Sequence, residues 1–221
     1  MYDFAVIFDM DGVIIENSEY HKRAWDKFAE KYGKELTEEE RKYHIYGTTN
    51  KTALKYILKR ELTSGELNMY GAEKEEIYRE IYRPYIKTTD NLIDFLDMLR
   101  GNNIDIGIAT SAGKENVDFI MNNLGIQWYF KKIIDADQIE KGKPNPEIYL
   151  KAAEELGYIP AKCIAIEDTV SGIIAGKNAG MKVIAITTTH LREELEEADL
   201  VIDNFNELDD MRKIIELVEK I

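Results

Sequence analysis

Six short, almost continuously apolar runs constrain the fold of this 221-residue chain more than any other feature of its sequence. The runs occupy residues 4–8, 104–109, 132–134, 163–166, 182–186 and 200–202. Apolar runs of this length are typical of strands that are buried on both faces, as in a parallel sheet. Patterns of helical length lie between the later runs, at residues 92–100, 114–124, 146–156 and 170–179. This alternation predicts right-handed β-α-β units and a three-layer α/β core built on an open, Rossmann-like parallel sheet.

The segment between the first two runs has a different pattern. From residue 16 to residue 87 it is charged, rich in Glu, Lys and Tyr, and without a strand-like run. Its apolar residues recur at the spacing of one helix face, as in Trp25, Phe28, Ala29 and Tyr32. We therefore predict an all-helical cap domain over 16–87, inserted into a discontinuous core made of 1–15 and 88–221.

The charge and the cysteine content narrow the classes of partner and compartment. The formal net charge of −13 disfavours nucleic acid and anionic membranes as partners, and a small anionic substrate would require local cations or a metal. The single cysteine, Cys163, excludes an internal disulfide and favours a reducing compartment. The start of the chain has no signal-peptide pattern, and no apolar stretch approaches the ~20 residues of a membrane-spanning helix. We expect a cytoplasmic protein that is a monomer or a weak dimer.

Two aspartates directly follow the first predicted strand. Asp9 and Asp11 stand at its carboxyl end, and Gly12 permits a sharp turn there. Two carboxylates so close repel each other unless a cation or a shared proton intervenes, and one can then serve as nucleophile while the other transfers protons. An acidic pair at a strand end is also ordinary turn chemistry.

Further polar groups follow the later strands. Thr110 and Ser111 form a hydroxyl pair that we expect to open a helix and to bind a phosphoryl oxygen, Lys143 could neutralise a nucleophile and the transferred group, and Glu167 with Asp168 could hold a metal. Each has an ordinary alternative, because hydroxyls and Asp168 can cap helices and a loop lysine can be solvated. All of these groups stand at the carboxyl ends of consecutive predicted strands, and coincidence is a poor explanation for this shared location.

Taken together, these segments resemble the four motifs of the haloacid dehalogenase superfamily. The matching segments are 9–13, 110–111, 143–146 and 167–168, and the resemblance covers essentially the whole chain, including the insertion point of a helical cap. It implies that Asp9 attacks phosphorus to form an aspartyl-phosphate.

The resemblance also implies the other roles at the site. Asp11 would be the general acid and base, and Thr110 with Lys143 would bind the phosphoryl group. The cofactor would be Mg²⁺, held by Asp9, the backbone carbonyl of Asp11 and Asp168, with Glu167 supporting.

Within the superfamily, the segment 19–25 is similar to the β-phosphoglucomutase-like subfamily. The resemblance implies that His21 helps to orient Asp11, although a satisfied histidine on a partly buried helix is an equal alternative. Lys74 stands where that subfamily places a lysine that reaches the active site, but an exposed i,i+4 ion pair fits it as well. Trp25 is expected in the core of the cap.

The chain departs from the mutase pattern in the cap. True β-phosphoglucomutases carry an arginine three residues after a cap glycine, and counting from Gly47 gives Asn50. Asn50 cannot supply a bidentate cation, and Lys51 would point about 100° away on a helix. In a mutase this arginine binds the distal phosphate of the bisphosphate intermediate. Weaker binding of that phosphate favours hydrolysis over the mutase reaction.

The sequence therefore predicts an enzyme, a Mg²⁺-dependent phosphatase of a small phosphorylated metabolite such as a sugar phosphate. The first alternative is a phosphomutase that interconverts β-glucose 1-phosphate and glucose 6-phosphate. The second alternative is a non-catalytic phosphate-binding protein. Asp11 argues against the dehalogenases and phosphonatases of the superfamily, which lack that acid.

Overall fold

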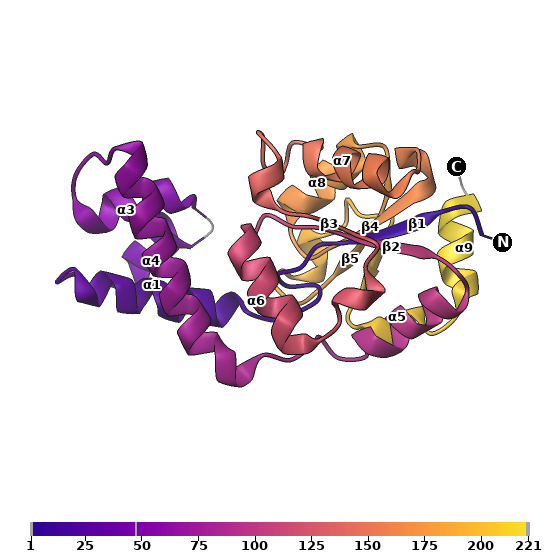
Figure 1. Ribbon diagram of the computed structural model, residues 1–221, viewed down its shortest axis with the longest axis horizontal. Helices are drawn as coiled ribbons and strands as arrows, with labels where there is room; N and C mark the ends of the chain where they lie inside the picture. Colours follow the sequence, from indigo (N-terminus) through magenta and orange to yellow (C-terminus); the bar gives the residue numbers. More distant parts are fainter. Residues whose placement is uncertain (1, 47, 220–221) are drawn as a thin grey trace. The chain divides into compact units, whose positions relative to one another are not determined.

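A computed structural model describes residues 2–46 and 48–219. Over these residues, six parallel strands form one sheet in the order β3-β2-β1-β4-β5-β6 (Figure 1). The strands are β1 Ala5–Phe8, β2 Asp105–Ala109, β3 Lys132–Ile134, β4 Cys163–Glu167, β5 Lys182–Ile186 and β6 Leu200–Ile202. Each lies within one residue of its predicted limits, which confirms the predicted parallel α/β sheet.

Helices cover both faces of the sheet. They are α5 Leu92–Gly101, α6 Lys114–Leu124, α7 Glu147–Leu156, α8 Val170–Asn178 and α9 Met211–Glu219. Helices α7 and α8 pack on one face, and α5 packs on the other, where it meets the short 3-10 helix Phe205–Leu208. The predicted three-layer arrangement is thus confirmed.

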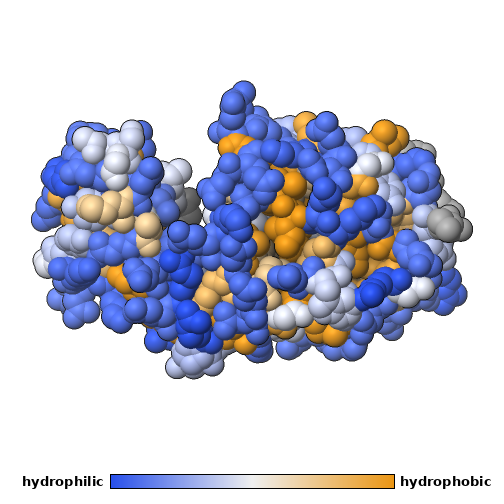
Figure 2. Space-filling view, in the orientation of Figure 1, coloured by the Kyte–Doolittle hydropathy of each residue, from blue (hydrophilic) through white to orange (hydrophobic). Residues whose placement is uncertain are grey.

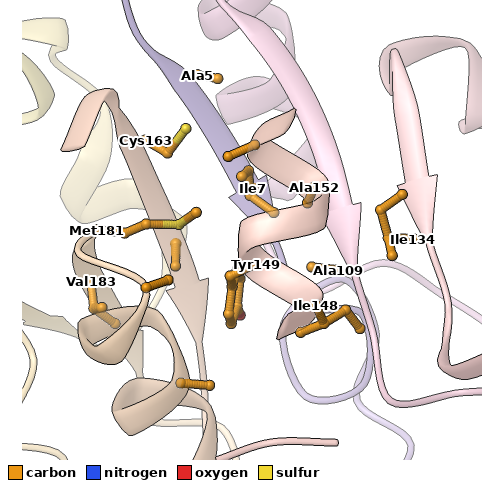
Figure 3. Packing of buried hydrophobic residues seen from close by; sticks show 14 of the residues in the cluster. Ala5, Ile7, Ala109, Ile134, Ile148, Tyr149, Ala152, Cys163, Met181 and Val183 are labelled. Atoms are coloured by element: carbon orange, nitrogen blue, oxygen red, sulfur yellow. The ribbon is translucent and has the colours of Figure 1, made fainter. Parts of the chain in front are cut away.

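The central strand β1 shows why its apolar run is continuous. Ala5 and Ile7 point into a buried cluster with Tyr149 of α7, as seen in Figure 3. Phe8 points to the opposite face and meets Phe95 of α5 edge-on, with ring centroids 6.0 Å apart. Because successive side chains of a strand alternate between faces, burial of both faces requires an apolar residue at every position.

The chain divides into two compact units, one formed by the residues up to Glu16 and from Ile86 onward, the other by Asn17–Tyr85. The second unit contains α1 Ser18–Lys31, α2 Glu38–Glu40, a π-helical turn at Arg41–Ile45, α3 Asn50–Leu58 and α4 Ser64–Tyr82. Trp25 is buried in its apolar cluster together with Phe28 and Leu54, as expected for a core residue.

The two chain segments that connect the larger unit to the helical unit run side by side. Ile15 forms an antiparallel bridge with Thr88, and the backbone N–H of Thr89 donates to the carbonyl of Ile14 over 2.9 Å. The Thr89 hydroxyl also donates to the carbonyl of Val13. These contacts hold the start and the end of the insertion together, next to the residues that follow β1.

Hydrophilic residues predominate on the face of the helical unit drawn in Figure 2, in keeping with a formal charge of −13. Among the described helices, none combines the length and the apolar character that crossing a membrane requires.

Candidate active site

The site begins where β1 ends, at the switch point of the sheet where chain connections diverge to β2 and β4. Asp9 directly follows β1, is 7% exposed, and donates its backbone N–H to the carbonyl of Ile166 over 2.9 Å. Asp11 follows in the turn and is half-buried. Gly12 has a φ of +81°, and a Cβ there would lie 1.9 Å from Oδ2 of Asp168. Both the backbone angle and the space therefore require glycine at this position.

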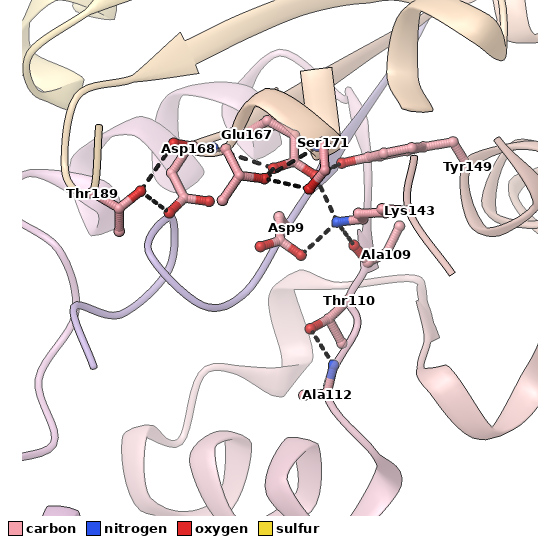
Figure 4. A network of polar contacts seen from close by, with 12 residues as sticks. Asp9, Ala109, Thr110, Ala112, Lys143, Tyr149, Glu167, Asp168, Ser171 and Thr189 are labelled. Atoms are coloured by element: carbon pink, nitrogen blue, oxygen red, sulfur yellow. Dashed lines mark hydrogen bonds and ion pairs between the residues drawn. The ribbon is translucent and has the colours of Figure 1, made fainter. Parts of the chain in front are cut away.

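Lys143 joins the acids that follow β1 and β4. Its Nζ donates to Oδ1 of Asp9 over 2.7 Å, to Oε1 of Glu167 over 2.6 Å and to the carbonyl of Ala109 over 3.1 Å (Figure 4). All three donor positions of the ammonium are used. The structure thus brings Asp9, Lys143 and Glu167 together from positions up to 158 residues apart (167 − 9).

The electrostatics follow from burial. Burial acts to lower the pKa of Lys143, but the carboxylates of Asp9 and Glu167 outweigh it and raise that pKa, so the lysine stays charged. Burial raises the pKa of Asp9; the Lys143 ammonium opposes the rise, and Glu167 and Asp168 add to it. Burial and the neighbouring Glu167 raise the pKa of Asp168 to about 7. The Lys143 ammonium therefore offsets only part of the effect of burial on Asp9 and Asp168.

Glu167 is the centre of the hydrogen-bond network and is 0% exposed. Its Oε1 accepts from Lys143 and from the Tyr149 hydroxyl, each over 2.6 Å. Its Oε2 accepts from the backbone N–H of Asp168 over 3.2 Å and from the Thr169 hydroxyl over 3.3 Å. Since a carboxylate has about four acceptor positions, this one is occupied by the protein itself.

Asp168 differs from Glu167 because only one of its two carboxylate oxygens accepts a hydrogen bond from the described residues. Its Oδ2 accepts from the Thr189 hydroxyl over 2.6 Å, while Oδ1 is buried without a hydrogen-bond partner among the described residues. One oxygen each of Asp9, Glu167 and Asp168 lies within 4.8 Å of the others. Crowded carboxylates with a buried, unpartnered oxygen suit a hard divalent cation, so the donor set fits magnesium.

One local expectation at the strand ends is wrong. Thr110 and Ser111 do not open a helix, because α6 begins at Lys114 after a Gly113 cap. Instead the Thr110 hydroxyl accepts from the backbone N–H of Ala112 over 3.1 Å, and this local turn separates strand from helix. Thr110 is buried at the site, whereas Ser111 is exposed.

The capping interpretation of Asp168 is also excluded. Helix α8 is capped by Thr169, whose hydroxyl accepts from the backbone N–H of Gly172 over 3.1 Å. Asp168 is consequently left for other contacts at the site.

Within the helical unit, His21 and Lys74 contact each other. Lys74 Nζ lies 2.8 Å from Nδ1 of His21 and 2.9 Å from Oε1 of Glu75. The His21 ring stacks on Tyr78 with centroids 3.8 Å apart, and burial with Lys74 lowers its pKa to about 3, so it is neutral. Lys74 is 2% exposed, and the interpretation as an exposed ion pair is therefore wrong.

The remaining cap positions lie at the start of α3. Asn50 is its first residue, Lys51 its second, and both are exposed. The side chain of Thr49 caps the helix. Gly47 lies outside the described residues.

Tyr149 and Thr189 were missed by the sequence analysis, although both contact site acids. Thr189 could have been found from the sequence, because it follows β5 closely and ligands bind beyond the carboxyl ends of parallel strands. Tyr149 had no comparable signal, because its apolar helix position indicates only a core residue.

Comparison with known proteins agrees with this geometry. Residues 6–186 match the family model described as haloacid dehalogenase-like hydrolase. The chain is 30% identical over 180 residues to a phosphorylated carbohydrates phosphatase of Thermotoga maritima, covering 81% of this chain and 83% of that protein. It is 35% identical over 195 residues to β-phosphoglucomutase of Bacillus subtilis, covering 82% of each.

A solved structure is similar over nearly the full length. The crystal structure of a HAD hydrolase, family IA, variant 3, from Entamoeba histolytica superposes with a TM-score of 0.92 and 34% sequence identity. The match covers 98% of this chain and 100% of that one.

Proposed function

The chain belongs to the haloacid dehalogenase-like hydrolases, in the β-phosphoglucomutase-like subfamily, and from this premise we propose that it is a Mg²⁺-dependent phosphatase of small sugar phosphates. Its relatives named above include both a phosphatase of phosphorylated carbohydrates and a phosphomutase, so phosphoryl transfer is common to both. What distinguishes the two outcomes is where the phosphoryl group goes next.

The observation that carries the proposal is the buried ammonium of Lys143 between Asp9 and Glu167. Burial favours the neutral form of Asp9, and the adjacent cation opposes this and helps to keep the carboxylate ionised. An ionised carboxylate at a strand end, beside a fixed cation that can also meet phosphoryl oxygens, is suited to attack phosphorus.

The proposed reaction has two displacements on phosphorus. In the first, a carboxylate oxygen of Asp9 bonds to phosphorus as the ester oxygen leaves, and Asp11 gives that oxygen a proton. In the second, Asp11 takes a proton from water, the water oxygen bonds to phosphorus, and Asp9 is released as carboxylate. Thr110, buried at the end of β2, and Lys143 bind the phosphoryl oxygens.

Magnesium would be held by Asp9, the backbone carbonyl of Asp11 and Asp168, with Glu167 supporting through Lys143. The ion supplies positive charge that neutralises the phosphoryl oxygens. The chain's own part is to present the unpartnered Oδ1 of Asp168 and to keep Glu167 engaged elsewhere.

We assign the helical unit 17–85 as the cap that selects the substrate, with His21, Lys74, Gly47, Asn50 and Lys51 as candidate contacts. Asn50 carries no charge where a mutase has its arginine, so a bisphosphate would be held weakly at its distal end. Water then competes more successfully for the aspartyl-phosphate.

A panel of phosphate esters tests this function. We expect Mg²⁺-dependent phosphate release from hexose and pentose phosphates, faster than conversion of β-glucose 1-phosphate to glucose 6-phosphate in a coupled assay. The Asn50→Arg variant is the matched probe, because its added guanidinium should raise the ratio of mutase to phosphatase turnover by about tenfold.

Faster conversion than release by the wild-type enzyme would identify a mutase instead. No release from any ester, with metal still bound, would support the non-catalytic alternative. The Lys55→Ala variant controls for simple charge changes on α3, because Lys55 lies on this helix and pairs with Glu61, and it should leave the ratio unchanged.

The pKa of Asp168 predicts a pH dependence of metal binding. In the metal-free protein its pKa is raised to about 7, so the carboxyl group is protonated at lower pH and must lose this proton to bind a cation. We expect the affinity for Mn²⁺ or Mg²⁺ to fall by up to about tenfold per pH unit below that pKa and to level off above it. Metal titrations from about pH 5 to pH 8.5 measure this, and an affinity that does not change over this range would contradict it.

A further inference from the structure

Three consecutive threonines follow β5, and their hydroxyls have three different partners. Thr187 donates to Oδ1 of Asp203 over 2.8 Å, at the surface. Thr188 donates to the carbonyl of Gly12 over 2.5 Å, in the turn after Asp9 and Asp11. Thr189 lies 2.6 Å from Oδ2 of Asp168 and 2.9 Å from its carbonyl oxygen.

The contact of Thr189 with Asp168 is the shortest that its hydroxyl makes. The same oxygen lies 2.9 Å from Nδ1 of His190, but a hydroxyl has only one proton to donate. The carboxylate is the stronger acceptor because it is charged and nearer. The Thr189 hydroxyl therefore donates to Asp168.

This hydroxyl determines which oxygen of Asp168 remains for a ligand. Oδ2 is engaged by Thr189 and also faces Gly12, where a Cβ would lie 1.9 Å from it. Oδ1 is buried and has no partner among the described residues. In Figure 4 the Asp168 carboxylate lies between Thr189 and Asp9.

We propose that Thr189 is a positioning residue of the metal site, whose hydroxyl holds Oδ2 of Asp168 so that Oδ1 faces the cation. The inference rests on the proposed function, since it concerns the magnesium site of that enzyme. Without the hydroxyl, the carboxylate can rotate about its Cβ–Cγ bond, and part of the binding free energy goes into restoring its orientation. Thr188 donates to the carbonyl of Gly12, the residue that Oδ2 also faces, so neighbouring threonines of one loop contact both Asp168 and the turn beside it.

Binding of Mn²⁺ alone tests the proposal without any turnover. Free Mn²⁺ is followed by its electron paramagnetic resonance signal in titrations of the wild type, Thr189→Val and Thr189→Ser, with Mg²⁺ as competitor. Valine has the shape of threonine but no hydroxyl, and we expect it to weaken binding by roughly 10- to 100-fold. Serine keeps the hydroxyl and should bind within about threefold of wild type.

Kinetics separate positioning from other roles. In Thr189→Val, the Mg²⁺ concentration for half-maximal phosphate release should rise in parallel with the loss of Mn²⁺ affinity. The KM for the ester at saturating Mg²⁺ should stay unchanged. Thr187→Val is the matched control, because its hydroxyl contacts Asp203 and not the site, and it should bind Mn²⁺ as the wild type does.

Each outcome decides a separate question. Wild-type protein that binds no Mn²⁺ would remove the metal site of the proposed function itself. Wild-type binding that Thr189→Val leaves unchanged would overturn the positioning role alone. Equal losses in the valine and serine variants would overturn it too, since the hydroxyl would then not be the cause. Thermal unfolding of all variants identifies any loss that comes from misfolding.

Discussion

Replacing Asp9 with asparagine will abolish phosphate release, lowering kcat by a factor on the order of 10⁴ or more. The amide is a far weaker nucleophile than the carboxylate, and it forms no stable aspartyl-phosphate. The fold should tolerate the change, because Lys143 retains its bond to Glu167 over 2.6 Å and the side chain keeps its shape. Single-turnover assays with a good substrate from the ester panel measure the loss.

The stability of the same variant has a predicted sign. The folded-state pKa of Asp9 is raised, so its ionisation destabilises the metal-free fold as pH rises from the unfolded pKa through the folded one. Asparagine does not ionise and avoids this penalty. At neutral pH, metal-free Asp9→Asn should unfold at a temperature no lower than that of the wild type.

Asp90→Asn is the control for Asp9→Asn, because this aspartate is exposed and pairs only with surface Lys87 among the contacts described. It should retain full activity. Turnover by Asp9→Asn above about one per cent of wild type, with contamination excluded, would mean that another group is the nucleophile.

Replacing Lys143 with methionine will damage both activity and stability. The ammonium is the partner of two buried carboxylates, at 2.7 Å from Asp9 and 2.6 Å from Glu167. Breaking a buried ion pair by removing one partner costs about 3–5 kcal/mol, because the remaining charge is left uncompensated. For a chain of this size that corresponds to a decrease in Tm of roughly 6–20 °C. Loss of the phosphoryl-binding cation should also lower kcat by about 10³-fold.

The destabilisation of Lys143→Met should depend on pH. Without the ammonium, the pKa of Asp9, already raised by burial, rises further, so protonation relieves the unpaired charge. The difference in Tm from wild type should therefore be smaller near pH 5 than near pH 8. Differential scanning calorimetry of the metal-free proteins measures it.

Lys114→Met provides the matched comparison for the loss of a lysine. Lys114 pairs with Asp118 at the surface of α6, where both side chains are more than half exposed, at 65% and 54%. Exposed pairs contribute about 0–1 kcal/mol, so this variant should unfold close to wild type. Equal Tm values for Lys143→Met and Lys114→Met at pH about 8 would contradict the buried ion pair.

The elements of the sheet were predictable because their signals are local. A strand buried on both faces needs an apolar residue at every position, and a helix needs apolar residues on one face. The run 163–166 meets the condition for a strand, and the pattern 114–124 meets the condition for a helix. The same logic placed Asp9, Thr110 and Asp168 at one edge, since parallel strands bring their carboxyl ends together.

Burial of Lys74 was not apparent from its acidic neighbours. It lies on the same face of α4 as the buried Tyr78 and Tyr82, spaced four residues apart, so periodicity contained a signal that the charge of the lysine obscured. A long lysine side chain can pack its methylene groups while its ammonium meets His21 and Glu75.

The parallel sheet and the residue types at its strand ends could be predicted from the amino-acid sequence alone. The pairing of individual atoms became visible only in the folded chain. Oε1 of Glu167 is taken by Lys143 and Tyr149, and Oδ2 of Asp168 by Thr189, which leaves Oδ1 of Asp168 for a cation. This difference arises because strand and helix patterns depend on residues that are close neighbours along the chain. A hydrogen bond between Thr189 and Asp168 depends on how two loops, 21 residues apart, pack over one edge of the sheet.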